Sequence, residues 1–310
     1  CGVPVLMSRP RPTNHAASAY AKLKNIAHEH NMNFMSLLIR YATERFLYRL
    51  SIADAAGQFV LKGGNLFVIW QKGQTCRPTV DADLLCFGNA EPGHLREVFL
   101  HAASAQASIN DGMRFDTNSI RVSAIREESE YGGTRITLNG FLTAAKIPLQ
   151  FDIGVGDAIT PPPALAEYPV LLGGLVPRLK VYPMATAIAE KTETMVSRGV
   201  INSRMKDFYD LWLLAELFDH DYATLRTAIS STFERRRVPM PSTTPEAWTA
   251  EFAASPVKKT QWTAFLRKHN LQTAPVDFAS VIARIALFLG PVFFPPGRSL
   301  TTWQAANSWM

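Results

Sequence analysis

Strand-like patterns occupy a small part of this chain and helical patterns surround them, which limits the fold more than any other feature. Apolar residues recur at helical spacing over 14–30 and 33–50, and again over 91–107, 183–197, 207–218, 222–234 and 277–289. Strand-like runs are confined to 59–61, 80–87, 120–125, 134–142 and 147–153. These segments alternate too rarely for a doubly wound sheet. The sequence therefore predicts an α+β fold, in which a small mixed sheet is flanked by helices and followed by a helical C-terminal half.

The length of 310 residues predicts about two folding units, at roughly 150 residues per domain. Hydrophobic residues make up 47% of the chain, which is enough for a sizeable core. Three consecutive prolines at 161–163 indicate an extended connector after the last predicted strand. We expect one domain over 1–178, with the N-terminal helices and the sheet, and a helical domain over 179–310 that completes a shared cleft.

Composition favours a cytoplasmic protein without a membrane span. No apolar run reaches the ~18 residues that a span requires, because the longest, 282–294, contains Arg284 and is broken by Gly290 and Pro291. The N-terminal residues show no apolar leader segment, and the three cysteines, Cys1, Cys76 and Cys86, are an odd number for a disulfide framework. The formal net charge of +6 is compatible with an anionic partner without requiring one.

Carboxylates on two predicted strands form the strongest local signal. Asp81 and Asp83 are two residues apart, so they share one face of a strand and repel each other unless a cation lies between them. Mg²⁺ prefers such oxygen ligands, although an exposed strand face with two solvated acids is the alternative. Asp152 takes the polar face of an otherwise apolar strand and would supply a third carboxylate. Asp157 is a less certain companion, since it also fits a turn.

Cationic and backbone groups that suit phosphate lie elsewhere in the chain. Gly63 and Gly64 stand between a short strand and a predicted helix, where bare backbone N–H groups can approach phosphate oxygens. Lys191 falls within an apolar helical stripe, so it must either extend to solvent or meet an anion. Asp207 and Asp210 are three residues apart on one helix, and Asp207 also fits a helix cap.

The order of these motifs resembles a known family. The matching stretches are 44–50, 59–65, 77–83, 151–157, 189–191 and 204–210, within roughly residues 15–215. Together they resemble the nucleotidyltransferase fold of the DNA polymerase β type, and more narrowly the AbiEii/AbiGii abortive-infection toxins. Where the wider superfamily often has Ser or Thr after the two glycines, this chain has Asn65. Thr79 keeps a hydroxyl where some related toxins are controlled by phosphorylation.

The resemblance implies roles for individual residues. The catalytic set is Asp81, Asp83, Asp152, Lys191 and Asp210, with Mg²⁺ (or Mn²⁺) held by Asp81, Asp83 and Asp152. The nucleotide-binding set is Gly63, Gly64, Asn65, Arg77, Thr79, Lys191 and Asp207. Whether Asp207 or Asp210 is the essential late acid stays open.

The resemblance also implies an activity. We expect a nucleotide to pass from an NTP to an acceptor, with release of pyrophosphate. The expected acceptor is RNA, for instance the 3′ end of tRNA, so that translation stops. A neighbouring gene is expected to encode an antitoxin. The alternatives are a protein that binds a nucleotide or an antitoxin without catalysis, and transfer to a protein or a small molecule.

Overall fold

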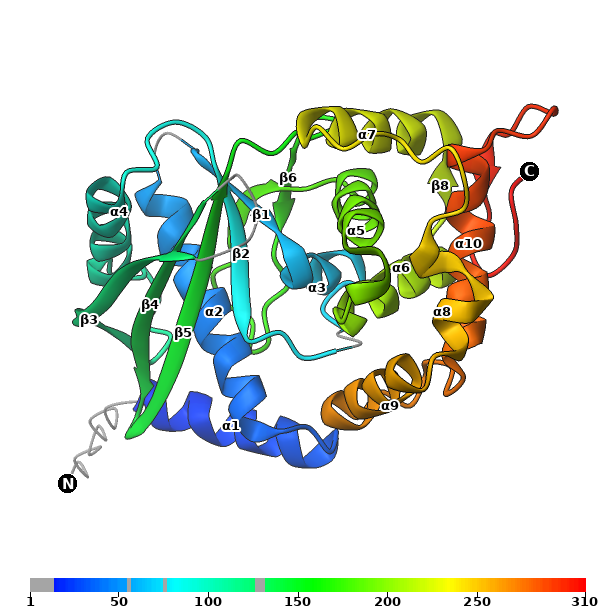
Figure 1. The fold of residues 1–310 in the computed structure, drawn as a ribbon. Coiled ribbons are helices and arrows are strands. Elements are labelled where there is room, and N and C mark those ends of the chain that lie inside the picture. The colour runs from blue at the N-terminus through cyan, green and yellow to red at the C-terminus, as the bar shows by residue number, and fades with distance from the viewer. Residues whose placement is uncertain (1–13, 55–56, 75–76, 126–131) are drawn as a thin grey trace, which may run out of the picture.

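A single mixed β-sheet forms the centre of the N-terminal part of the molecule (Figure 1). The computed structural model describes residues 14–310 apart from 55–56, 75–76 and 126–131. Within these residues the sheet has seven strands in the order β3-β4-β5-β2-β1-β7-β6. The strands are β1 (Phe59–Lys62), β2 (Asp81–Cys86), β3 (Met113–Ile125), β4 (Gly133–Leu142), β5 (Ala145–Val155), β6 (Ala164–Glu167) and β7 (Arg178–Val181).

Helices cover one face of this sheet because the strands present their apolar side chains to it. The helices are α1 (His15–Glu29), α2 (Phe34–Ala53) and α4 (Pro92–Ser104). Phe46 of α2 lies at the centre, with its ring 4.8 Å from Phe151 of β5 and 5.4 Å from Phe99 of α4. The Asn14 and Asn33 side chains accept hydrogen bonds from the first turns of α1 and α2, which fixes where both helices begin.

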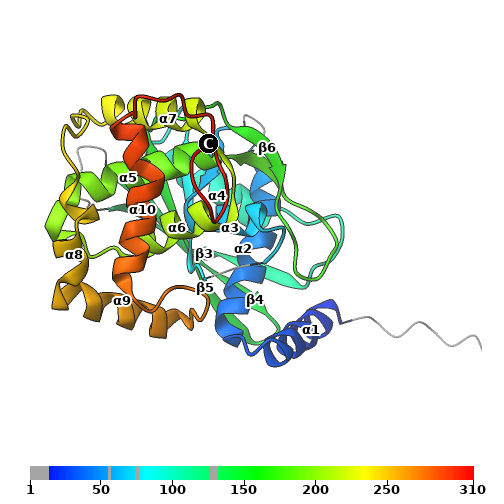
Figure 2. The ribbon, with the colours of Figure 1, turned by 90° about the vertical axis from the view of Figure 1, so that its right-hand side faces the viewer.

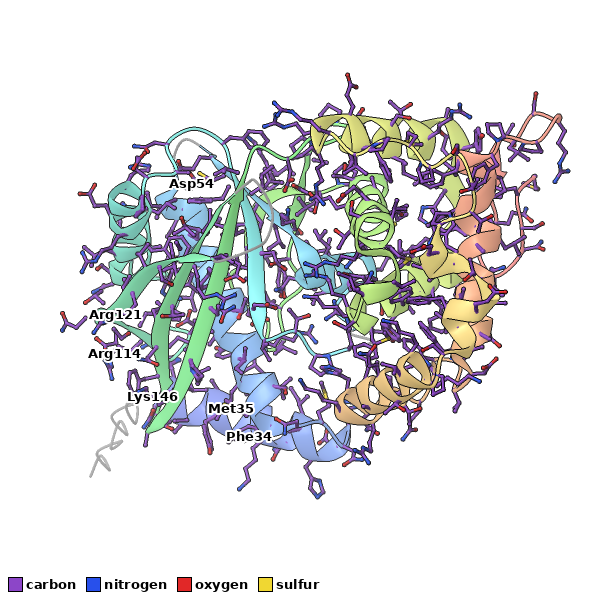
Figure 3. All side chains as sticks on the ribbon, in the orientation of Figure 1. Phe34, Met35, Asp54, Arg114, Arg121 and Lys146 are labelled. Atoms are coloured by element: carbon purple, nitrogen blue, oxygen red, sulfur yellow. The ribbon has the colours of Figure 1, made fainter. Side chains whose placement is uncertain are left out.

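The outer edge of the sheet is charged. β3 is a terminal strand, and Arg114 and Arg121 project from it into solvent, as Lys146 does from β5 (Figure 3). Charged side chains on an edge strand discourage pairing with another chain.

The second half of the chain is helical and has its own core. Its elements are α5 (Met184–Arg198), α6 (Met205–Leu217), α7 (Tyr222–Arg235), α8 (Ala250–Ala254), α9 (Pro256–His269) and α10 (Phe278–Phe293), with a hairpin of β8 (His220–Asp221) and β9 (Thr302–Trp303). Figure 2 shows α10 crossing the outer side of α5 and α6. The aromatic C-terminal segment packs back on these helices, since Trp303 is fully buried and donates a hydrogen bond to Ala215 O.

The structure confirms the α+β prediction and corrects its details. β3 begins at Met113 instead of residue 120, and β6, β7, α8 and α9 were not predicted. β6 and β7 have only four residues each and are largely exposed, so they carry no apolar alternation. The short α3 (Leu66–Trp70) follows a turn of 3₁₀-helix, η1 (Gly63–Asn65), close to the predicted helix.

Two hydrophobic clusters of buried residues divide the core near residue 188, except that Phe67 belongs to the second. The domain boundary at 178/179 stays a prediction.

In the described part of the chain, no helix is long and apolar enough to cross a membrane. Cys86 is a buried free thiol, while Cys1 and Cys76 lie outside the described residues.

Candidate active site

Three carboxylates from neighbouring strands meet on the face of the sheet opposite α2. β2 pairs in parallel with β5, in a register that places Asp83 beside Asp152, and Asp81 is two residues before Asp83 on the same face. Ligand atoms from all three side chains lie within 4.8 Å of one another, and each residue is half-buried. Sequence reasoning placed these three together, and the parallel pairing of β2 with β5 is what brings Asp152 to the pair.

Asp83 is the most constrained of the three acids. Burial, together with the negative charge of Asp81, raises the pKa of Asp83 to about 6. Gly63, from the end of β1, packs directly against it: a Cβ on Gly63 would come within 1.9 Å of Asp83 Oδ2. Gly63 also has a φ of +70°, so both its backbone and its surroundings require glycine. Part of the function of Gly63 is therefore to leave room for this carboxylate.

Asp152 is held in place by two side chains of the same sheet. Arg135 of β4, its cross-strand neighbour, donates bonds of 2.8 Å from Nε and Nη2 to the two carboxylate oxygens. Gln150 Nε2 lies 3.2 Å from Asp152 Oδ1. The side chain of Arg135 is 41% exposed, so this ion pair is open to solvent on one side. Asp152 is thus oriented toward the pair on β2 while its charge is partly offset.

A cleft of about 190 Å³ opens beside the triad, between the sheet and the helical half. Asp83, Gly63 and Gly64 line one side. The rest of the wall is strongly cationic and comes from β1, the segment before β2, α5, α6 and the residue that follows α7. Its six basic residues are Lys62, Arg77, Lys191, Arg204, Lys206 and Arg236. The acids Glu190 and Asp207 also line it. Such a wall suits a polyanion.

A buried ionic network joins the sheet side of the cleft to α5 and α6. Arg77 donates two hydrogen bonds to the Asp210 carboxylate, one of 2.7 Å from Nε and one of 2.8 Å from Nη2. Lys191 Nζ lies 2.8 Å from both Asp210 Oδ2 and Asp207 Oδ1. Arg204 Nε approaches Asp207 Oδ2 to 2.6 Å. The anion that the buried Lys191 requires is therefore supplied by the protein itself.

This network keeps both acids ionised. Although burial opposes it, Arg77 and Lys191 lower the pKa of Asp210, and Lys191 and Arg204 lower the pKa of Asp207 well below its usual range. Asp210 is fully buried, so it holds Arg77 and Lys191 in place and does not face the cleft. Asp207 lines the cleft but is only 2% exposed.

A second network lines the far end of the cleft. Lys62 Nζ lies 2.7 Å from Asp157 Oδ2 and 3.1 Å from Glu190 Oε2, and Arg236 Nη2 lies 3.2 Å from Asp157 Oδ1. Despite burial, Glu190 and Asp157 raise the pKa of Lys62 well above its usual value. Asp157 belongs to this network and not to the triad.

Two predicted nucleotide-binding residues, Asn65 and Thr79, contact other parts of the protein, and their role in nucleotide binding stays a prediction. Asn65 is 5% exposed, with its amide nitrogen donating to Asp81 O and its amide oxygen accepting from the Tyr168 hydroxyl. Its hydrogen bond to Asp81 O anchors the start of β2. Thr79 lies against Gly64, where a Cβ would come within 2.6 Å of Thr79 Oγ1.

Sequence reasoning did not identify several cationic residues of the cleft. Lys62 directly precedes the two glycines, Lys206 directly precedes Asp207, and Arg204 stands three residues before Asp207, so the signal available in the sequence was their position next to a motif. Arg236 lies in the charged run 234–237, so a local cluster of arginines was the signal available there. The structure places it at 23% exposure in the second network.

Three carboxylates on a mixed sheet beside a cationic cleft define a class of protein, in which a divalent cation and basic side chains act on phosphate groups. Comparison with known families gives the narrower answer. A family model described as nucleotidyl transferase AbiEii toxin, type IV TA system, matches residues 45–284, well over half of the chain. The chain belongs to the AbiEii nucleotidyltransferase toxin family, which confirms the resemblance seen in the sequence.

Solved structures with a similar backbone arrangement include two from Helicobacter pylori. The protein JHP933 superimposes with a TM-score of 0.49 at 12% identity, over 84% of this chain and 92% of its own. A second protein, named as a candidate nucleotidyltransferase, gives a TM-score of 0.48 at 13% identity, over 85% of this chain and 96% of its own. Comparison with curated proteins finds no match.

Proposed function

We propose that this protein transfers a nucleotide from an NTP to an RNA acceptor, the 3′ end of tRNA, and thereby blocks translation. The observation that carries the proposal is the convergence of Asp81, Asp83 and Asp152 at the mouth of a cationic cleft. Membership of the AbiEii family supports the same reaction class.

The triad fits Mg²⁺ or Mn²⁺. Its donors are carboxylate oxygens only, which these hard cations prefer. The raised pKa of Asp83 means that its charge is poorly compensated by the protein alone, as expected of a site built for a cation. A divalent cation held by Asp81, Asp83 and Asp152 would supply positive charge against the triphosphate and the leaving group.

The remaining side chains orient the substrates. Lys206, Lys62 and Arg236 line the cleft where the triphosphate is proposed to lie. The acceptor hydroxyl oxygen bonds to the α-phosphorus while the bond to the bridging oxygen breaks, and pyrophosphate leaves with the electron pair. Asp152 would either share the cation or accept the hydroxyl proton. Arg77 and Lys191, fixed by Asp210, hold positive charge at the side of the cleft.

The family supplies the biological setting of the proposal. A type IV toxin acts in the cytoplasm, where NTPs and tRNA are found, and an antitoxin limits its effect. We infer that such a partner is encoded nearby and that the pair acts in abortive infection as phage defence.

The proposal is tested by a transfer assay. Purified protein is incubated with Mg²⁺, each of the four α-³²P-labelled NTPs and total tRNA, and the products are separated on a denaturing gel. We expect label on tRNA with at least one NTP. Parallel reactions with total protein and with small hydroxyl compounds identify another acceptor, which would overturn the RNA assignment and keep the reaction class.

The matched control applies the same substitution, Asp to Asn, at a position in the triad and at a position away from it. Asp83→Asn removes a carboxylate of the triad, whereas Asp277→Asn alters the exposed N-cap of α10, where Asn caps equally well. We expect Asp83→Asn to abolish labelling and Asp277→Asn to retain it. Equal labelling by both variants, or NTP binding without label on any acceptor, would contradict the proposed reaction.

A further inference from the structure

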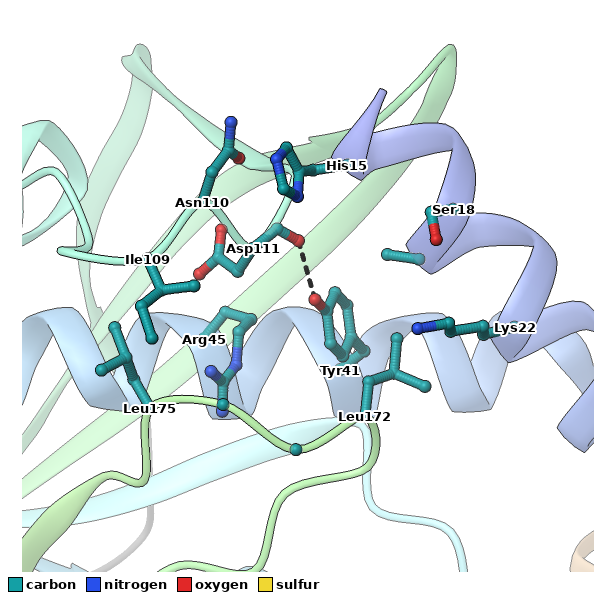
Figure 4. Close-up of a pocket in the computed structure, with 13 residues that line it drawn as sticks. His15, Ser18, Lys22, Tyr41, Arg45, Ile109, Asn110, Asp111, Leu172 and Leu175 are labelled. Carbon is teal, nitrogen blue, oxygen red and sulfur yellow. Dashed lines mark hydrogen bonds between the residues drawn. The ribbon is translucent and has the colours of Figure 1, made fainter. Parts of the chain in front are cut away.

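A second cavity lies on the side of the molecule covered by the N-terminal helices. Its volume is about 170 Å³, and it lies between α1, α2, the turn at 109–111 and the loop at 172–175 (Figure 4). The triad projects from the sheet face opposite α2, so this cavity is separate from the cleft. All of α1 and the first part of α2 precede residue 45, where the family match begins.

The floor of the cavity contains a buried arginine that is short of partners. Arg45 is 2% exposed, and neither its Nε nor its Nη2 makes a hydrogen bond among the described residues. Its counter-ion is Glu44, whose Oε1 lies 3.4 Å from Arg45 Nε and is likewise without a hydrogen bond there. A buried guanidinium with unsatisfied N–H groups is costly, so such a group marks a position where an acceptor belongs.

Glu44 offsets the charge of Arg45 only in part. Burial raises the pKa of Glu44 to about 7, although Arg45 and the Leu171 N–H oppose this rise. A good share of Glu44 is therefore neutral near neutral pH. The guanidinium then retains positive charge that an oxyanion would balance.

The other walls of the cavity do not repel an anion. Among the described residues that line it, Asp111 is the only acid, and Arg49 neutralises it with hydrogen bonds of 2.7 Å and 3.0 Å. Lys22 extends from α1 toward Tyr41 and Leu172 (Figure 4), and no ion pair to it is found within the described ranges. Ser18 and Asn110 add polar groups at the rim.

We propose that this cavity is a binding site for a small oxyanion, a carboxylate or a phosphate monoester, held by the Arg45 guanidinium and faced by Lys22. Arginine is suited to this chemistry because its planar fork matches two oxygens of one group.

The test is calorimetric titration of the full chain with two probes, inorganic phosphate and malonate. The probe that binds with higher affinity shows whether the site prefers a phosphate or a carboxylate. Lys22→Met should weaken binding about threefold, in line with one exposed charge, and Arg45→Lys about tenfold, since the fork is lost but the charge remains. Lys24→Met, two positions along α1 and outside the cavity lining, is the matched control and should leave binding unchanged.

Binding of phosphate in the cleft does not confuse this result, because Lys22 is not part of the cleft. Unchanged affinity in Lys22→Met would overturn the proposal, as would the absence of binding by either probe. If Arg45→Lys fails to fold, the proposal is tested on the native protein instead, by following the NMR signal of the Arg45 Nε–H group in a ¹⁵N-labelled sample. A shift on addition of the tighter probe supports the site, and a fixed signal at saturation overturns it.

Discussion

Asp83 combines three constraints in one side chain. It is partly buried, it lies beside Asp81, and Gly63 leaves room for its carboxylate only because glycine has no Cβ. Burial and the charge of Asp81 both disfavour the ionised form of the Asp83 carboxylate. The close packing of Gly63 limits the positions that this carboxylate can take. A divalent cation relieves the first two, so the geometry favours a metal site over an exposed acidic strand.

The pH dependence of stability follows from the same residue. The pKa of Asp83 is about 6 in the folded chain, above its value of 3.8 in an unfolded one, so its contribution is present below the unfolded pKa and is lost as pH rises through 6. Without divalent metal, Asp83→Asn should therefore stabilise the protein at pH 7.5 by about 3 kcal/mol, and hardly at pH 4. Thermal unfolding in EDTA measures this. An equal change at both pH values would contradict it.

Gly63 and Gly88 form a natural pair for testing close packing. Both have positive φ, +70° and +97°, but a Cβ on Gly88 would meet nothing within 4 Å. Each Gly→Ala change should cost about 1–3 kcal/mol through backbone strain. Only Gly63→Ala should also abolish Mg²⁺-dependent activity, because its methyl displaces the Asp83 carboxylate. Transfer assays and denaturant titrations of both variants measure the two effects, and an inactive Gly88→Ala would contradict this explanation.

At the scale of elements, α5 and α6 are tied to the sheet by charge. Arg77 precedes β2, Lys191 lies on α5 and Asp210 lies on α6, and all three meet in one buried network. Truncating one member of such a network leaves the others buried without a partner.

Asp210→Asn should therefore destabilise the protein by about 3–5 kcal/mol. Adding Arg77→Met to it should cost much less than the sum of the two single changes, because the two residues act as a pair. Urea unfolding of the single and double variants measures this coupling. The exposed pair Arg178 and Glu167, whose side chains are each 67% exposed, is the control and should contribute less than about 1 kcal/mol. Strict additivity for Arg77 and Asp210 would contradict the buried network.

The sequence predicts elements where local periodicity is strong and misses those that depend on tertiary contacts. The face shared by Asp81 and Asp83 follows from strand geometry, whereas the partnership of Lys191 with Asp207 and Asp210 depends on how α5 packs on α6. The hydrogen bond that the Tyr168 hydroxyl donates to the amide oxygen of Asn65, 103 residues away, could not be predicted from the neighbours of Asn65 in the sequence. Contacts between residues so far apart in the sequence leave no recognisable pattern in the residues around either partner.

For the whole molecule, the cleft lies between the two hydrophobic clusters, so a bound nucleotide would link them. Lys206 is exposed at its wall, and its charge opposes the rise in the pKa of Asp83 that burial and Asp81 cause, which places Lys206 near the triad.

Lys206→Met should weaken NTP binding about fivefold while leaving the unfolding temperature of the free protein unchanged, because an exposed charge contributes little to folding. The nucleotide-induced rise in unfolding temperature should shrink accordingly. Lys268→Met, on the exposed face of α9 and away from the cleft, is the control. Equal nucleotide responses in the two variants would remove Lys206 from the binding site.

The most direct test of the account is whether the triad holds a divalent cation. Mn²⁺ titration followed by electron paramagnetic resonance should show bound Mn²⁺ in the native chain and in Asp277→Asn. The doubly substituted chain Asp81→Asn/Asp83→Asn should lose at least one bound ion. The same number and affinity of bound ions in all three proteins would contradict the assignment of Asp81, Asp83 and Asp152 as the metal site.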